Sequence, residues 1–132
     1  MRLTSIKGRA ALHPDVVLAM SALGTDWTDT CNEPDNAEYG AALSRCGSTV
    51  SRFRVGKITP TKMGMFVAVW RRAADGSTEP FPASDSITSL IVVIREDHHF
   101  GAFTFSKDVL EQQQIVSADG KGARFINLCV SG

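Results

Sequence analysis

The sequence predicts a single α+β domain, in which a mixed and mainly antiparallel sheet is flanked by helices. Three observations favour this fold class. The length of 132 residues suits one domain and is enough to bury a core without disulfide staples. Several strand-like runs follow one another through the middle of the chain. One helical pattern precedes these runs, and another separates the last two strands.

The elements before the centre are predicted from local signals. Residues 13–24 are predicted to form a helix, because Pro14 suits the first helical position and apolar residues then recur at helical spacing. Residues 25–37 are rich in Asp, Thr, Asn and Pro, which predicts an exposed loop. A strand is expected from residue 38 to about residue 43, and residues 46–48 then turn into the central stretch.

The central stretch is residues 52–72, RFRVGKITPTKMGMFVAVWRR, and the rest of the chain is organised around it. It holds two strand-like runs joined by a turn at residues 59–62, where Pro60 has no N–H to give to a ladder. The second run, residues 65–70, is apolar on both faces, which predicts a strand covered above and below. Residues 75–76, Asp-Gly, make the next turn.

The elements after the centre follow the same reasoning. Residues 90–94 are five consecutive large apolar residues, which predict a strand buried on both faces. Ser106 is a suitable N-cap for a short helix. The prediction for this part is a loop at 76–86, strands at 87–94 and 100–105 joined by a polar connection at 95–99, a helix at 107–114 with Val109 and Leu110 facing inward, a turn at 117–122 and a last strand at 124–130.

Charge is unevenly distributed along the chain. The total is 14 basic and 14 acidic residues, which gives a net charge of zero. Residues 39–74 nevertheless contain seven Arg or Lys and no Asp or Glu, while the segments on either side are acidic. A local positive field on folded strands attracts phosphate, so the distribution favours a nucleic-acid partner. The alternative is that these cations only provide solubility and protect strand edges.

If the central stretch binds nucleic acid, its cations contact phosphates and its exposed aromatic rings stack on bases. Single-stranded DNA or RNA is the expected partner, because no recognition helix for a duplex is evident. Tyr39 and Phe66 are candidates for stacking together with Trp70, which we expect to be at least half buried. The expected binding residues are Arg52, Arg54, Lys57, Thr59, Lys62, Trp70, Arg71 and Arg72.

Other kinds of site have weaker signals. The three cysteines, at positions 31, 46 and 129, lack metal-ligand spacing, and their odd number favours free thiols. The adjacent His98 and His99 are typical of an exposed turn. The sequence therefore predicts no metal site and no cofactor. It also predicts no membrane partner, because no apolar run approaches the roughly 18 residues that span a bilayer. With no targeting segment evident, the cytoplasm is the expected location. The oligomeric state stays open.

The central stretch resembles the "AKITPTK-x-G-x-FV-x-xWKR" signature of the MepB family. Residues 55–62 (VGKITPTK) and 64–72 (GMFVAVWRR) carry it, and residues 38–40 (EYG) resemble the family's first strand. With similar motifs at 91–105 and 107–115, the resemblance covers about residues 38 to 122. The chain departs from the family where a serine, residue 106, replaces the usual proline. Its C-terminal part also lacks the family's Arg-Val-Tyr-Pro-Pro-Trp.

The resemblance implies a fold similar to PD-(D/E)XK endonucleases, with a restriction-endonuclease-like core, nucleic-acid affinity and a link to a multidrug-efflux operon. A nuclease of that kind holds Mg²⁺ with two or three carboxylates and uses a lysine on adjacent strands. Here the central strands carry cations instead. The sequences Pro-Asp at 34–35 and Asp-Gly-Lys at 119–121 fall in a predicted loop and turn. Glu38 is the one carboxylate near a strand start that could face the basic surface.

These features predict a protein that binds nucleic acid without cleaving it, and two alternatives stay open. The first is a sensor of small anionic molecules, in which the Arg/Lys cluster lines a pocket. A closed pocket around Arg54, Lys57 and Arg71 favours that sensor, and an open stripe of cations favours nucleic acid. The second is a metal-dependent nuclease with a rearranged site, drawn from Glu38, Asp85, Glu96 and Lys57.

Overall fold

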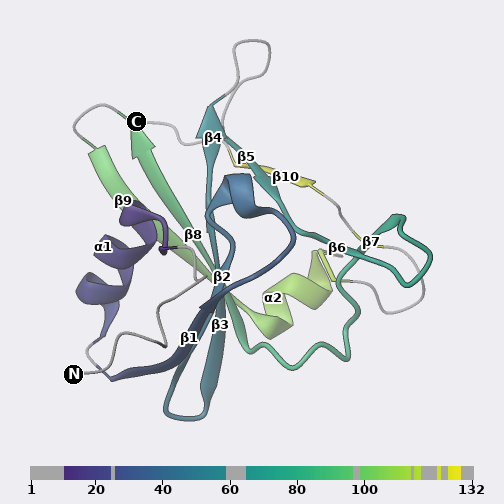
Figure 1. Cartoon of the computed structure of the whole chain (residues 1–132), viewed down its shortest axis with the longest axis horizontal. Coiled ribbons are helices and arrows are strands. Elements are labelled where there is room, and N and C mark those ends of the chain that lie inside the picture. The colour runs from purple at the N-terminus through teal and green to yellow at the C-terminus, as the bar shows by residue number, and fades with distance from the viewer. Residues whose placement is uncertain are drawn as a thin grey trace.

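The computed structural model describes residues 11–24, 26–58, 65–96, 99–113, 115–116, 122 and 125–128. Figure 1 shows their arrangement. The helices are α1 (Pro14–Leu23), the short 3₁₀ helix η2 (Ala37–Tyr39) and α2 (Lys107–Gln112). The strands are β1 (Trp27–Asn32), β2 (Ala42–Cys46), β3 (Thr49–Val55), β4 (Lys57–Ile58), β5 (Met65–Ala68), β6 (Trp70–Arg72), β7 (Thr78–Pro80), β8 (Ser89–Glu96), β9 (His99–Ser106) and β10 (Phe125–Leu128).

The main sheet has five strands in the order β1-β2-β3-β8-β9. Every neighbouring pair in it is antiparallel except β3 and β8, which run parallel. A parallel pair needs a long crossover, and here the crossover carries β4, β5, β6 and β7. Strands β4 and β5 form a small sheet with the C-terminal β10, in the order β10-β5-β4, and β6 pairs with β7 in another. The predicted α+β class with a mixed, mainly antiparallel sheet is confirmed.

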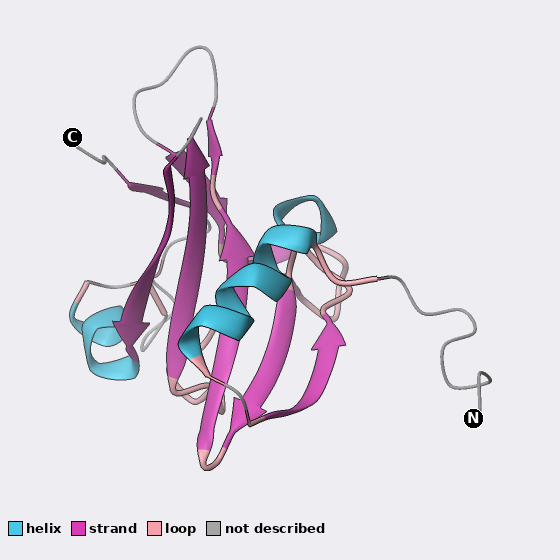
Figure 2. Ribbon diagram, turned by 90° about the vertical axis from the view of Figure 1, so that its left-hand side faces the viewer, coloured by secondary structure: helices cyan, strands magenta, loops and turns pink. Residues whose placement is uncertain are grey.

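Helix α1 covers one face of the main sheet, and Figure 2 shows it lying across the strands. Pro14 begins the helix as expected, and the backbone N–H of Gly24 closes it on the carbonyl of Met20. The core on this side contains Val16 and Phe53. Because side chains alternate along a strand, the odd-numbered residues of β3 and β8 face this helix.

The opposite face of the sheet packs against α2 and β5. Leu90 and Val92 of β8 lie there beside Val67 of β5 and Leu110 of α2. Strand β8 is therefore buried on both faces, as its continuous apolar run predicted. The even-numbered residues of β3 point the same way as Leu90 and Val92, because β3 and β8 are paired in register. Arg52 and Arg54 therefore point toward the layer that contains β5 and α2.

The polar stretch 25–37 is not a loop throughout, because residues 27–32 form strand β1. This strand pairs with β2 at the edge of the main sheet, and most of its side chains are exposed. An exposed edge strand has no apolar alternation, so nothing in its sequence marked it as a strand. The strand expected from residue 38 begins later, at Ala42. The residues before it form η2, whose end at Gly40 has a positive φ of 61°.

Three further predictions need correction. The run 65–70 is well buried, but it is divided between β5 and β6 and belongs to the small sheets. The loop expected at 76–86 contains the short strand β7, which pairs with β6 across the expected Asp75–Gly76 turn. In α2 only Leu110 is buried, and Val109 is exposed. The expected turns at 59–62 and 117–122 lie outside the described residues, apart from residue 122.

The last strand is confirmed as β10, which pairs antiparallel with β5. The first run of the central stretch is also divided: β3 ends at Val55 and belongs to the main sheet, whereas the two residues of β4 pair antiparallel with β5 in a small sheet. Among the described residues, no helix is long and apolar enough to cross a membrane.

Candidate functional site

Two arginines of the central stretch lie inside the protein. Arg52 and Arg54 are alternate residues of β3, so both point from the main sheet toward the layer that contains β5. Arg52 is 5% exposed and Arg54 is 0% exposed. Arg54 donates from Nε to the carbonyl oxygen of Ala68 in β5, at 3.0 Å. The guanidinium of Arg52 lies over the ring of Phe81, 3.6 Å from its centroid.

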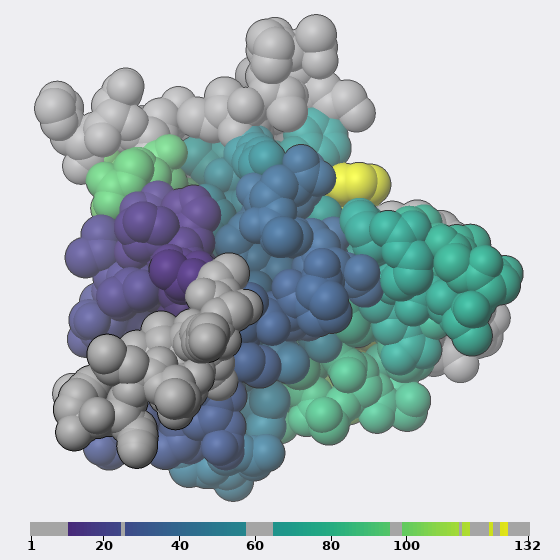
Figure 3. Space-filling view, in the orientation of Figure 1, coloured from purple at the N-terminus to yellow at the C-terminus, as the bar shows by residue number. Residues whose placement is uncertain are grey.

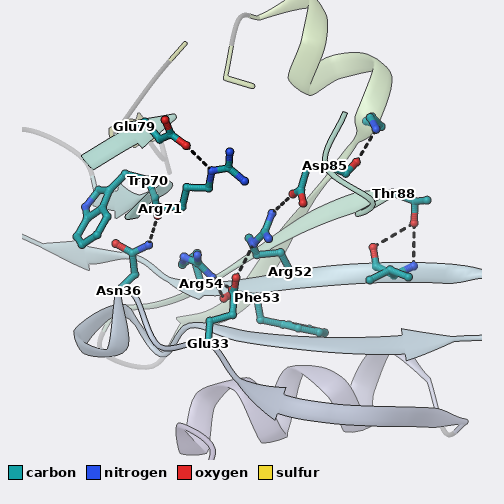
Figure 4. Close-up of polar contacts among 12 residues, drawn as sticks. Glu33, Asn36, Arg52, Phe53, Arg54, Trp70, Arg71, Glu79, Asp85 and Thr88 are labelled. Carbon is teal, nitrogen blue, oxygen red and sulfur yellow. Dashed lines mark hydrogen bonds and ion pairs between the residues drawn. The ribbon is translucent and has the colours of Figure 1, made fainter. Parts of the chain in front are cut away.

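Both arginines are paired with carboxylates, as Figure 4 shows. Glu33 accepts from Nε of Arg52 through Oε2 and from Nη1 of Arg54 through Oε1. Asp85 accepts from Nη1 of Arg52. Glu33 lies just after β1 and Asp85 lies in the segment before β8, so neither belongs to the basic stretch itself. The four groups form a buried network with two positive and two negative charges.

Burial sets the electrostatics of this network. Removal from water lowers the pKa of the Arg54 guanidinium, while the charge and the hydrogen bond of Glu33 raise it. Arg54 stays charged at any ordinary pH, so its buried charge depends on Glu33. Two polar atoms of the region are buried without a hydrogen-bond partner: Nη2 of Arg54 and Oδ1 of Asn36. Each such atom costs about 1–3 kcal/mol of stability.

The segment that carries Glu33 has a defined local structure. The N–H of Glu33 donates to the carbonyl of Ala41, and Tyr39 donates to Asn36, so residues 33–41 fold back on themselves. Asn36 has a φ of 64°, a left-handed conformation that asparagine tolerates better than most residues. Gly40 is required here, because a Cβ at that position would lie 2.9 Å from Cγ2 of Val55. These contacts fix the position of Glu33 over β3.

The other described cations of the central stretch, Lys57, Arg71 and Arg72, lie at or near the surface. Nζ of Lys57 lies 4.7 Å from the ring centroid of Tyr39. The guanidinium of Arg72 lies 5.0 Å from the ring centroid of Trp70. Arg71 pairs with Glu79 at 2.7 Å, across the β6–β7 hairpin. Figure 3 shows the segment around η2, in blue, side by side with the β6–β7 segment, in teal.

A hydrogen bond joins these two parts of the surface. Nδ2 of Asn36 donates to the carbonyl oxygen of Trp70 at 2.6 Å. Trp70 is only partly exposed, as expected, and Tyr39 is also partly exposed. Burial, together with the negative charge of Glu38, raises the pKa of the Tyr39 hydroxyl, so the ring carries no charge near neutral pH. The arrangement offers two aromatic rings, each with a cation over it, on one face.

The structure separates the residues that we expected to form one open stripe. Arg52 and Arg54 are buried and ion-paired, because the even-numbered side chains of β3 face the layer that contains β5. Lys57, Trp70, Arg71 and Arg72 lie at or near the surface as expected. Arg54, Lys57 and Arg71 pair with three different carboxylates, Glu33, Glu38 and Glu79. Thr59 and Lys62 lie outside the described residues.

Three of the carboxylates weighed as metal ligands, Glu38, Asp85 and Asp35, have other partners, while Asp119 lies outside the described residues. Glu38 lies 3.6 Å from Nζ of Lys57, and its side chain is 71% exposed. Asp85 is bound to Arg52. Asp35 accepts the backbone N–H of Arg72 through Oδ2 at 2.9 Å. Within the residues that the structure describes, no three His, Cys, Asp or Glu side chains are grouped so that they could hold a metal ion.

Sequence reasoning missed Glu33 and Asn36, which are central to the observed site. Both lie in the polar stretch that we expected to be an exposed loop. Nothing local distinguishes Glu33 from the other acidic residues of that stretch. The one usable signal was the absence of acid between residues 39 and 74, because buried arginines must then find their carboxylates elsewhere in the chain.

The fold and the site together define a small α+β protein with a buried arginine–carboxylate network beneath an aromatic and basic surface. The MepB-like family model matches residues 33–128, and the chain belongs to that family. The crystal structure of MepB is similar, with a TM-score of 0.76 at 21% sequence identity. The match covers 88% of this chain and 80% of that one. No match was found among curated proteins.

Proposed function

We propose that this protein binds single-stranded DNA or RNA, without cleaving it, on the surface formed by η2, β4 and β6. The observation that carries the proposal is the pair of aromatic rings with cations over them, Tyr39 with Lys57 and Trp70 with Arg72. Bases stack on aromatic rings whatever their sequence, and nearby cations contact the phosphates between them. Arg71 adds a partly exposed cation beside this surface, with its side chain on the opposite side of β6 from Trp70 and Arg72. Lys62 is included by the charge argument from the sequence.

The ion pairs at this surface do not prevent binding. Lys57 pairs with Glu38, and Arg71 pairs with Glu79, but all four side chains are substantially exposed. Exposed pairs of this kind are worth only about 0.2–1 kcal/mol. A phosphate that carries a full negative charge can therefore replace either carboxylate at little cost. The buried network of Arg52 and Arg54 is different, because its carboxylates cannot be exchanged without opening the structure.

We also infer a restriction-endonuclease-like core that has lost its metal site. A mixed five-stranded sheet covered on both faces supports this inference. Arg52 and Arg54 stand on a central strand where a nuclease needs carboxylates, and the two carboxylates beside them, Glu33 and Asp85, are held as their ion-pair partners. A role in drug response follows from the family's link to multidrug-efflux operons, and the cytoplasm is the compartment in which we expect it.

Fluorescence anisotropy with a labelled single-stranded oligonucleotide tests the proposal. The affinity is expected to fall linearly on a logarithmic salt axis, with a slope that reflects about three to four phosphate contacts. Replacing Trp70 should weaken binding, whereas replacing Trp27, which lies on the α1 side, should not. Adding Mg²⁺ should leave the strand intact, and Mg²⁺-dependent loss of label would support the rearranged nuclease. Absence of binding at low salt would contradict the proposal and favour a small anionic ligand.

A further inference from the structure

One short segment touches both the buried arginines and the proposed binding surface. Within residues 33–36, Glu33 pairs with Arg52 and Arg54. Two residues later, Asp35 accepts the backbone N–H of Arg72. Asn36 then donates to the carbonyl of Trp70. Segment 33–36 therefore lies between the interior pair of cations and the residues that we propose to bind nucleic acid.

The two oxygens of Glu33 bridge Nε of Arg52 and Nη1 of Arg54. A carboxylate and a phosphodiester each present two oxygens to guanidinium N–H groups, with similar geometry. Asp85 bonds only to Nη1 of Arg52, so it does not compete for the groups that Glu33 uses. If Glu33 were displaced, Nε of Arg52 and Nη1 of Arg54 would be free to donate to another anion.

The closed arrangement leaves hydrogen bonds unmade. Nη2 of Arg54 is a buried donor without a partner, on a side chain that is 0% exposed. Oδ1 of Asn36 is a buried acceptor without a partner, on a side chain of segment 33–36 itself. A phosphodiester beside Arg54 could accept from Nη2 as well as from Nη1. Opening the segment returns Oδ1 of Asn36 to water, which lowers the cost of opening.

We propose that residues 33–36 are an acidic strap that closes a phosphate site on Arg52 and Arg54. The phosphodiester backbone of a bound single strand displaces Glu33 from that site. This inference rests on the proposed function, and it adds a second phosphate position beneath the aromatic surface. Binding at Trp70 and Arg72 disturbs the contacts of Asn36 and Asp35, which couples the surface to the strap.

The first test compares two variants with the same change of charge. Glu33→Gln weakens the strap, and Glu111→Gln removes one carboxylate from the exposed side of α2. If strap opening limits affinity, Glu33→Gln should tighten oligonucleotide binding about tenfold, because the open state becomes more populated. Glu111→Gln should change it by about twofold or less. Equal effects of the two variants, both folded by circular dichroism, would overturn the strap.

A second test uses the unmodified protein, so that it does not depend on the stability of a variant. Hydrogen exchange is followed with and without a saturating single-stranded oligonucleotide. The amide of Glu33, whose N–H donates to Ala41, should exchange faster in the complex, and so should that of Arg72, whose N–H donates to Asp35. Slower exchange throughout residues 33–36 would show that the strap stays closed. Failure of the wild-type protein to bind at low salt would instead reject the proposed function.

Discussion

The two arginines of β3 and the two arginines of β6 come from one basic stretch but have opposite environments. Arg52 and Arg54 are buried and share Glu33. Arg71 and Arg72 lie at the surface, beside Glu79 and Trp70. Strand β3 is central in the main sheet, whereas β6 belongs to a two-stranded sheet. The position of a strand in the sheets therefore decides whether its arginines are buried in ion pairs or exposed to solvent.

The difference has an energetic consequence. A buried guanidinium must be paired, since an isolated charge in the interior is strongly unfavourable. An exposed guanidinium is solvated with or without its partner, so its ion pair contributes little. We therefore expect the inner pair to control stability and the outer pair to control binding. The following predictions test that division, from the largest expected effect to the smallest.

Arg54→Ala should have the largest effect on stability. It leaves Glu33 with one partner instead of two and removes the bond to the carbonyl of Ala68, which is expected to lower the free energy of unfolding by about 3–5 kcal/mol. Arg71→Ala is the matched variant at the surface, with an expected loss of about 1 kcal/mol or less. Urea denaturation measures both. Similar losses in the two variants would break the comparison.

Trp70→Ala should have the largest effect on binding. Loss of one stacking ring is worth about 1–3 kcal/mol of binding free energy, or roughly 5- to 150-fold in affinity. Trp27→Ala is the control, since Trp27 packs against Phe53 with ring centroids 5.4 Å apart on the α1 side. That variant should lose stability and keep its affinity per folded molecule. Anisotropy titration of both proteins separates the two effects.

Arg72→Ala should reduce the salt dependence of binding. Removal of one phosphate contact is expected to lower the slope of log affinity against log salt by about one. Arg95→Ala carries the same change of charge, but Arg95 bonds to Asp15 of α1 and is not one of the proposed binding residues. The slope for Arg95→Ala should equal that of the wild type. An equal decrease in both variants would indicate a nonspecific effect of net charge.

The smallest effect concerns acid pH at the β6–β7 turn. Ser77 donates its N–H and its hydroxyl to Oδ1 of Asp75, which lowers the pKa of that carboxyl from 3.8. A lowered pKa means that the turn is stabilised above pH 3.8 and loses this contribution as the pH falls through the folded-state value. An NMR titration of Asp75 measures the shift. In Ser77→Ala the midpoint should rise toward the ordinary value.

Much of the fold was predictable because its signals are local. The helix at 14–23, the strand β8 and the hairpin partner β9 follow from capping residues and from apolar runs. Strand β1 was missed because its side chains are exposed on an edge, so no periodic pattern marks it. The exposed Val109 was misassigned for a related reason, since a helix of six residues is too short for a stripe to be defined.

The sequence predicted which residues contribute to the candidate site, but it predicted the wrong location for two of them. The aromatic and basic residues at positions 57, 70, 71 and 72 were selected from the sequence, and the structure places them at or near the surface. Arg52 and Arg54 were expected beside them, but the imperfect alternation of β3 did not reveal which face is buried. Their partners Glu33 and Asp85 are 19 and 33 positions away in the sequence, which no local pattern can indicate.

The fold class, the family and the separation of basic from acidic segments follow from the sequence alone, because each depends on residues that are neighbours along the chain. The ion pairing of Arg52 and Arg54 with carboxylates from outside the basic stretch is visible only in the folded protein. Glu33 and Asp85 are brought onto Arg52 by chain folding, since a buried charge requires a partner whatever its distance in sequence. The cations left at the surface are those that the sheets do not enclose.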